Sequence, residues 1–177
     1  MQPVGNAWDS RSSGWGVGRG PALTVHWLET KLPAPVMALL IGAAMKWFAV
    51  GHPEAVDPTP AHRMAGIVLA QIAGLIAVAA FVTMARARTT INPFSPTRAS
   101  HLVTAGVFRW SRNPLYLSLL MLLVGYAIRI DSWQTWLAPL AFVAYVTRFQ
   151  IIPEERYLQI KFGEAFDQYR TRTRRWI

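Results

Sequence analysis

Two short segments carry most of the polar side chains that could do chemistry in an otherwise apolar half of the chain. The first, Ser111 to Tyr116, holds an arginine, an amide and a phenol close together. The second, Pro153 to Leu158, begins with two adjacent carboxylates, Glu154 and Glu155. A guanidinium can hold an anionic group, and a carboxylate can hold a cation or accept a proton. The two segments together are suited to binding a charged small molecule.

Each segment also has a purely structural explanation. Pro114 suits the first turn of a helix, where its missing N–H is not needed, and Asn113 is placed to cap that helix. Pro153 with Glu154 and Glu155 is a favourable helix start as well, because carboxylates complement the positive end of the helix dipole. Spacing alone does not choose between these explanations and a functional site.

Long apolar blocks set the architecture. The chain has 177 residues, of which 53% are hydrophobic and 15% charged. Its four blocks are apolar all round, unlike the one-sided stripe of a soluble helix, and most approach the roughly 20 residues that span a bilayer. The blocks are residues 32–50, 64–85, 114–128 and 133–152. We therefore expect an all-α integral membrane protein with four transmembrane helices, in which residues 1–31 form a polar tail and residues 32–177 one membrane domain.

The positive charges predict the orientation. The net charge is +9. Arginines are concentrated between the second and third blocks and in the C-terminal tail, whereas the other two connections hold few basic residues. By the positive-inside rule both termini and the long loop face the cytoplasm, and the protein lies in the cell (inner) membrane as a multi-pass protein. A chain this basic and this apolar indicates anionic lipid headgroups as partners, not nucleic acid. The sequence predicts no oligomeric state.

Topology brings the two polar segments together. Only a few residues join the third and fourth blocks, so these blocks form an antiparallel hairpin whose cytoplasmic ends carry both segments. Ionisable groups beside lipid are costly and are more often functional than incidental. After the fourth block, apolar residues recur at helical spacing, which predicts a cytoplasmic amphipathic helix over residues 153–170.

Several classes of site are excluded. The chain has no cysteine, which removes disulfides and cysteine-ligated metals. Its histidines show no ligand spacing, so no metal site is expected; they are His26, His52, His62 and His101. Alternating glycines over residues 13–20 suggest a phosphate loop only superficially, because no strand precedes them.

The motifs resemble a known superfamily. Val103-Thr104-x-Gly106-x-Phe108, Ser111-Arg112-Asn113-Pro114-x-Tyr116, Glu154-Glu155-x-x-Leu158 and Phe162-Gly163-x-x-Phe166-x-x-Tyr169 occur in this order. They resemble the isoprenylcysteine carboxyl methyltransferase and phospholipid methyltransferase superfamily over residues 64–177. The resemblance implies S-adenosylmethionine bound between the hairpin and the C-terminal helix, and a lipophilic substrate that enters from the bilayer.

The resemblance also implies roles for individual residues. The cofactor would be held by one set: Val103, Gly106, Phe108, Asn113, Pro114, Tyr116, Glu154 and Glu155. Arg112, Glu154 and Glu155 are the candidate catalytic residues. Arg86, Arg88 and Asn92 are candidates for substrate binding, although Asn92 fits a plain turn before Pro93 equally well.

Two questions stay open at the level of sequence. Eukaryotic isoprenylcysteine enzymes have histidine where this chain has Asn113, which is more similar to phospholipid N-methyltransferases. A carboxylate acceptor needs an arginine to hold it, whereas an ammonium acceptor needs a base such as a glutamate. The alternative from another class is a non-enzymatic membrane scaffold, whose basic run Arg170 to Arg175 binds anionic lipid.

Overall fold

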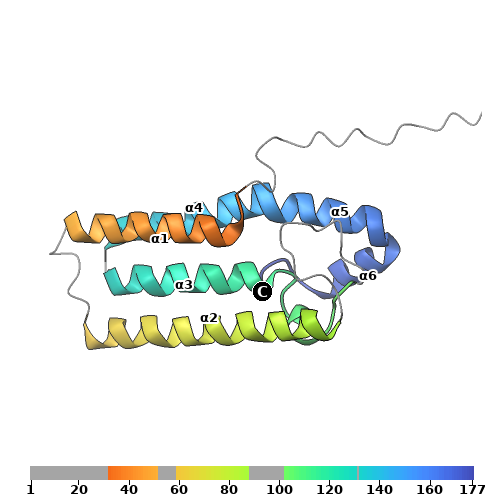
Figure 1. Cartoon of the computed structure of the whole chain (residues 1–177), viewed down its shortest axis with the longest axis horizontal. Helices are drawn as coiled ribbons and strands as arrows, with labels where there is room; N and C mark the ends of the chain where they lie inside the picture. The colour runs from red at the N-terminus through yellow and green to blue at the C-terminus, as the bar shows by residue number, and fades with distance from the viewer. Residues whose placement is uncertain (1–31, 52–58, 88–101, 131) are drawn as a thin grey trace, which may run out of the picture.

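The computed structural model describes residues 32–51, 59–87, 102–130 and 132–177, and these parts form helices without a strand. The α-helices are α1 (Ala34–Gly51), α2 (Pro60–Arg86), α3 (Pro114–Ile130), α4 (Leu137–Val146), α5 (Ile152–Phe162) and α6 (Glu164–Arg172). Two short 3₁₀ turns, η3 (Gly106–Arg109) and η4 (Trp133–Trp136), and one π-helical turn, η5 (Thr147–Ile151), complete the set. The expected all-α architecture is confirmed for these residues (Figure 1).

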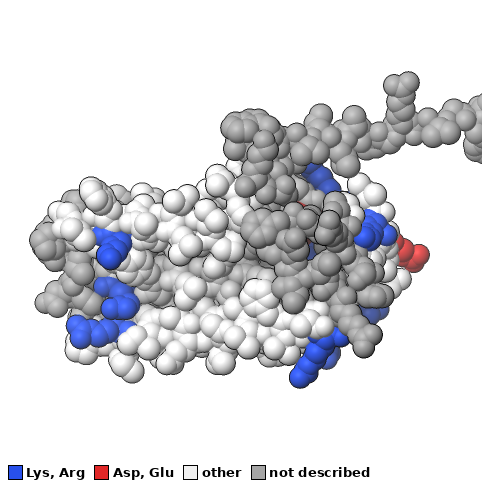
Figure 2. Space-filling model, viewed as in Figure 1, with Lys and Arg blue, Asp and Glu red and all other residues white. Residues whose placement is uncertain are grey.

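Three helices in the described part are long and apolar enough to cross a membrane. They are Ala34–Gly51, Pro60–Arg86 and the continuous run Trp133–Phe162, while the apolar helix α3 is shorter at 17 residues. Figure 2 shows Lys and Arg side chains at the two ends of the bundle, with an uncharged surface between them. The polar tail, residues 1–31, lies outside the described residues.

Proline and threonine determine where the helices begin. Thr59 caps α2, since its hydroxyl oxygen accepts a hydrogen bond from the His62 N–H at 3.3 Å. Pro60 follows at the first helical position, so α2 starts before the apolar block 64–85 that predicted it. Pro114 begins α3 in the same way, at the position expected from the sequence.

Glycines bring α2 and α3 into close contact. A Cβ added to Gly66 would lie 2.8 Å from the carbonyl oxygen of Gly125 and 2.5 Å from Cγ of Arg129. A Cβ added to Gly125 would lie 3.0 Å from the carbonyl oxygen of Gly66. Small residues allow such close approach of helix backbones, which is a main source of attraction between helices in lipid.

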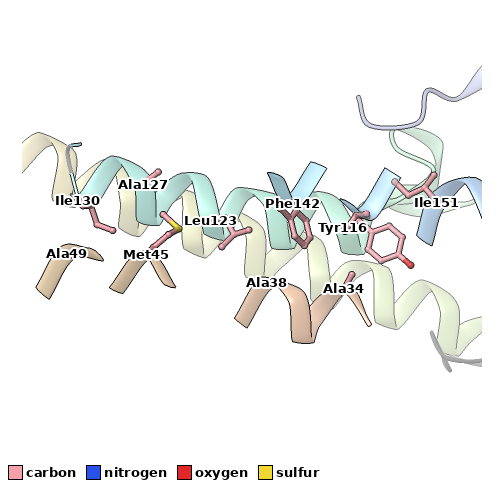
Figure 3. Packing of buried hydrophobic residues seen from close by; sticks show 11 residues of the cluster. Ala34, Ala38, Met45, Ala49, Tyr116, Leu123, Ala127, Ile130, Phe142 and Ile151 are labelled. Carbon is pink, nitrogen blue, oxygen red and sulfur yellow. The ribbon is translucent and has the colours of Figure 1, made fainter. Parts of the chain in front are cut away.

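A second interface joins α1, α3 and α4 around the hydrophobic core. Figure 3 shows Met45 of α1 beside Leu123 of α3, and Phe142 of α4 farther along the same layer. Phe142 and Val146 are completely buried. At the start of α1, the carbonyl oxygen of Leu32 accepts a hydrogen bond at 2.8 Å from Nε2 of the buried Gln150. The start of α1 is therefore fixed to η5.

The C-terminal region differs from the single helix predicted over residues 153–170. The fourth apolar helix continues through Pro153 into α5 and ends only at Gly163, whose φ of 50° is accessible to glycine. A proline ring clashes with the carbonyl four residues earlier, here Phe149, which lies in the wider π turn η5. The widened turn explains why Pro153 does not end the helix.

After Gly163 the chain reverses, so that α6 folds back towards the start of α3 (Figure 1). Phe166 and Tyr169 are only 1% and 8% exposed. Two of the apolar residues that recur at helical spacing, Phe166 and Tyr169, are therefore packed inside the protein, whereas Leu158 and Phe162 are half-buried and Ala165 is exposed. The prediction of one amphipathic helix is wrong in this respect, because side-chain spacing cannot distinguish burial against protein from burial against lipid.

The glycine contact between α2 and α3 makes a testable prediction. Gly66→Ala should lower the thermal unfolding midpoint in detergent, since the added Cβ meets backbone and costs about 1–3 kcal/mol. Gly74→Ala is the matched control in the same helix, because its added Cβ meets nothing within 4 Å. Equal midpoints for the two variants would contradict the close approach.

Candidate functional site

The centre of the candidate site is a buried phenol–carboxylate pair. Tyr116 lies in the first turn of α3 and Glu154 in the first turn of α5. The Tyr116 hydroxyl donates a hydrogen bond to Oε1 of Glu154 at 2.5 Å. Tyr116 is 9% exposed. The α3–α4 hairpin thus brings together the two segments that the sequence singled out.

Beside the Tyr116–Glu154 pair, one carboxylate forms salt bridges with two guanidinium groups. Nη2 of Arg112 is 2.8 Å from Oε1 of Glu155, and Nη2 of Arg175 is 2.6 Å from Oε2 of the same carboxylate. Arg175 also donates from Nε to Oε1 at 3.1 Å. The side chains of Arg112 and Glu155 are 11% and 13% exposed. Because this carboxylate binds two guanidinium groups, its charge is compensated within the protein.

The last residues of the chain form a strap, residues 173–177, across the turn that precedes α3. The Arg112 N–H donates to the carbonyl oxygen of Arg174 at 3.0 Å. Nη1 of Arg112 donates to the carbonyl oxygen of Thr173 at 2.9 Å, and Nδ2 of Asn113 donates to that of Arg175 at 3.0 Å. Both side chains of the Arg112-Asn113 pair are therefore held by the strap.

The η3 turn forms the adjacent wall of the site. Gly106 has a φ of 59°, and a Cβ there would lie 2.8 Å from Oγ1 of Thr83 in α2. Glycine is needed at this position both for the backbone conformation and for the space. The Tyr169 hydroxyl of α6 donates to the carbonyl oxygen of Phe108 at 2.7 Å. The η3 turn is thus held between α2 and α6.

The pKa values of Tyr169 and Arg175 keep these two side chains in the protonation states that their hydrogen bonds require. Burial raises the pKa of Tyr169 to about 12, although the positive charge of Arg112 acts in the opposite direction. The hydrogen bond to Glu155 raises the pKa of Arg175 above its ordinary value. Tyr169 therefore stays a hydrogen-bond donor and Arg175 stays charged across physiological pH.

The structure brings most of the predicted site residues to one end of the bundle. These are Gly106, Phe108, Arg112, Asn113, Pro114, Tyr116, Glu154 and Glu155. Val103 lies half-buried in the segment before η3. Arg86 is exposed in the last turn of α2. Arg88 and Asn92 lie outside the described residues.

The sequence does not predict the strap. It indicates Arg175 and Thr173 only as part of a basic lipid-binding run, and Tyr169 as part of an apolar stripe and of the last family motif. Most of their contacts involve backbone carbonyl oxygens, for which no residue pattern exists. One available signal is charge, because Glu155 needs a cationic partner.

No set of three or more side chains that could hold a metal ion occurs in the described segments. Nε of Arg112 is buried and has no hydrogen-bond partner among the described residues. A buried N–H of this kind is costly unless it meets an acceptor, so Nε of Arg112 is an unsatisfied donor next to Glu155.

The strap generates the second prediction. Arg175→Gln should lower the thermal unfolding midpoint by an amount equivalent to about 1–2 kcal/mol, between the values for exposed and buried ion pairs. It should also speed tryptic cleavage after Arg170 and Arg172, because the strap detaches. Arg174→Gln is the matched control: Arg174 contributes its carbonyl oxygen to Arg112, and its side chain is exposed. The same cleavage rate in both variants would exclude an anchoring role for Arg175.

Comparison with known proteins identifies the family. The model of the phospholipid methyltransferase family matches residues 61–165, which is more than half of the 177 residues. An uncharacterized protein of Haemophilus influenzae is 36% identical over 63 residues, which cover 36% of this chain and the whole of that protein. The search of solved structures found no significant match. The matched range includes α2, α3, α4 and the Tyr116–Glu154 and Arg112–Glu155 contacts, and the chain therefore belongs to the phospholipid methyltransferase family.

Proposed function

We propose that this protein is an integral membrane methyltransferase that uses S-adenosylmethionine to methylate a lipid-like acceptor. Membership of the family implies methyltransferase activity in general. The observation that carries the proposal is the buried Tyr116–Glu154 pair beside the Arg112–Glu155–Arg175 ion pair, at one end of an apolar helical bundle.

The proposal includes four membrane spans, with α3 as the shortest. Its 17 residues extend about 25 Å, close to the roughly 30 Å of a hydrocarbon core, and local thinning of the bilayer accommodates the difference. Basic residues around the site end, including Arg86, Arg109 and Arg112, support a cytoplasmic location of this end by the positive-inside rule. Both chain termini then lie on the cytoplasmic side of the cell membrane.

The polar groups of the site fit the polar groups of S-adenosylmethionine. The cofactor carries hydroxyl and ammonium donors and a carboxylate acceptor, and it supplies an electrophilic methyl group. Glu154 offers the acceptor oxygens of a carboxylate, and Asn113 keeps its Oδ1 because only its Nδ2 is used by the strap. Arg112 offers its unpartnered Nε to a carboxylate.

The contacts of the Arg112 guanidinium group support an amine, and not a carboxylate, as the group that receives the methyl. Both terminal nitrogens of Arg112 already bind Glu155 and the strap, so they are not available to orient an acceptor carboxylate. Glu154 has no guanidinium partner in the described structure, where its carboxylate accepts a hydrogen bond from the Tyr116 hydroxyl. A carboxylate of this kind can take the proton that an ammonium group must lose before its nitrogen attacks.

In this account Glu154 is the catalytic base, and Tyr116 orients its carboxylate. S-adenosylmethionine would supply the methyl group, and Glu154 would take the proton that the acceptor ammonium must lose before its nitrogen can accept that group. Glu155 and Arg112 are positioning residues, because their charges are satisfied by each other and by Arg175. Alignment of the nucleophile with the methyl group supplies much of the remaining rate.

The contacts of the strap argue against the alternative function, a non-enzymatic membrane scaffold. That alternative depends on the run Arg170 to Arg175 facing anionic lipid. Arg175 instead binds Glu155, and the carbonyl oxygens of Arg170 and Thr173 accept from Arg112. These contacts support a role for the C-terminal segment in completing a site.

The third prediction follows methyl transfer directly. Membranes containing the protein, supplied with methyl-labelled S-adenosylmethionine, should incorporate label into extracted lipid in a form stable to mild base. Turnover should rise with pH as the amine or its base loses a proton. Glu154→Gln should reduce turnover by about 10²-fold or more, the usual contribution of a general base. Glu164→Gln is the control, since Glu164 is exposed on α6.

Two other outcomes of this assay would change the proposed function. A base-labile label with turnover flat from about pH 6 to 9 would mark a methyl ester, because a carboxyl acceptor is already ionised there. That result would assign the protein to carboxyl O-methylation of an isoprenylcysteine-like compound. No label in any lipid, with wild-type protein folded and membrane-inserted, would favour the scaffold.

A further inference from the structure

A groove of about 570 Å³ runs along the contact between α1 and α3. Its lining includes Ala38, Gly42 and Lys46 from α1, and Leu119, Leu123 and Tyr126 from α3. The volume is in the range of small-molecule sites in proteins. The lining is apolar apart from the polar ends of Lys46 and Tyr126, so the groove suits a hydrocarbon chain.

Small residues of α1 keep the groove open. A Cβ added to Gly42 meets nothing within 4 Å, so α3 does not close onto α1 at this point. Farther along α1, Met45 and Ala49 are buried in the core that α1 shares with α3. In a bilayer an apolar space open at the protein surface is filled by lipid chains, since water finds no hydrogen-bond partners there.

Charge at one end of the groove selects the headgroup. Lys46 is the only charged residue among those that line the groove. Arg63 in the first turn of α2 and Arg129 in the last turn of α3 lie at this same end of the bundle, which Figure 2 shows as a gathering of basic side chains. The acidic residues of the two connections at this end, Glu54, Asp57 and Asp131, lie outside the described residues. Within the groove lining, Lys46 supplies the positive charge that complements an anionic headgroup.

We propose that the groove binds an acyl chain of an anionic bilayer phospholipid, whose phosphate lies against Lys46. The headgroup end of this site is distant from the methyl-transfer site: Lys46 and Tyr126 lie at the opposite end of the bundle from Tyr116 and Glu154, whereas Leu119, at the other end of the groove, is one helical turn from Tyr116. Its α1 wall also lies outside residues 61–165, the part matched by the family model. The lipid fastens α1 to α3, so binding stabilises the fold by linkage.

The test uses the full chain, purified and stripped of lipid in a neutral detergent. Titration with phosphatidylglycerol should raise the thermal unfolding midpoint saturably and more than phosphatidylcholine does, and native mass spectrometry should show the bound lipid. Lys46→Gln should weaken phosphatidylglycerol binding about fivefold, and Lys46→Arg should preserve it. Arg63→Gln, which removes an exposed cation at the same end but outside the groove lining, should weaken it clearly less than Lys46→Gln does.

A second pair of variants tests the chain pocket. Gly42→Leu fills the groove without a backbone clash and should abolish the lipid-dependent rise. Gly74→Leu adds the same side chain in open space on α2 and should not. Equal losses in Lys46→Gln and Arg63→Gln, or in Gly42→Leu and Gly74→Leu, would overturn the proposal. So would loss of lipid binding in Glu154→Gln, because the groove would then hold the methyl acceptor instead.

Discussion

The carboxylate of Glu155 is the contact on which the candidate site depends. It binds Arg112 from the turn before α3 and Arg175 from the C-terminal strap, while its own backbone lies in the first turn of α5. Three segments that are distant in the sequence are therefore joined through this one carboxylate. Removing Glu155 would leave the largely buried guanidinium group of Arg112 without a counter-charge, which is strongly unfavourable, whereas removing Arg175 leaves Glu155 paired with Arg112. The same contact holds Arg112 and Asn113 beside Tyr116, and this arrangement leaves Glu154 as the carboxylate without a guanidinium partner in the described structure.

The bilayer explains why the molecule separates its polar and apolar parts so completely. Helices satisfy their backbone groups internally, so they can expose large apolar side chains to lipid, as Leu39, Trp47 and Leu75 do. Burying apolar surface gives little attraction between helices in lipid, so close backbone contacts such as Gly66–Gly125 hold the bundle together. Where that contact is lacking, between α1 and α3, a groove remains. The two ends of the bundle then serve different purposes: one holds the candidate methyl-transfer site, and the other offers positive charge to a lipid headgroup.

Local sequence signals predicted the parts of the structure that depend on local chemistry. Pro114 marked the start of α3. The short connection between the third and fourth apolar blocks predicted a hairpin, and this hairpin places Tyr116 beside Glu154. The strap could not be predicted, because Thr173 and Arg174 contribute carbonyl oxygens that every residue possesses. The sequence also did not predict that the fourth apolar helix continues through Pro153. Proline normally indicates a helix start or end, and the π turn η5 that accommodates it has no sequence signature.

Binding of the reaction product tests the central claim most directly, because it requires no knowledge of the acceptor. Isothermal titration calorimetry of the detergent-purified full chain with S-adenosylhomocysteine should give saturable binding at one site. Glu154→Gln should weaken that binding while the protein keeps its thermal stability, since the neutral amide retains a hydrogen-bonding group for Tyr116. Absence of heat at millimolar ligand, with the wild-type protein folded, would contradict the assignment of this site to S-adenosylmethionine.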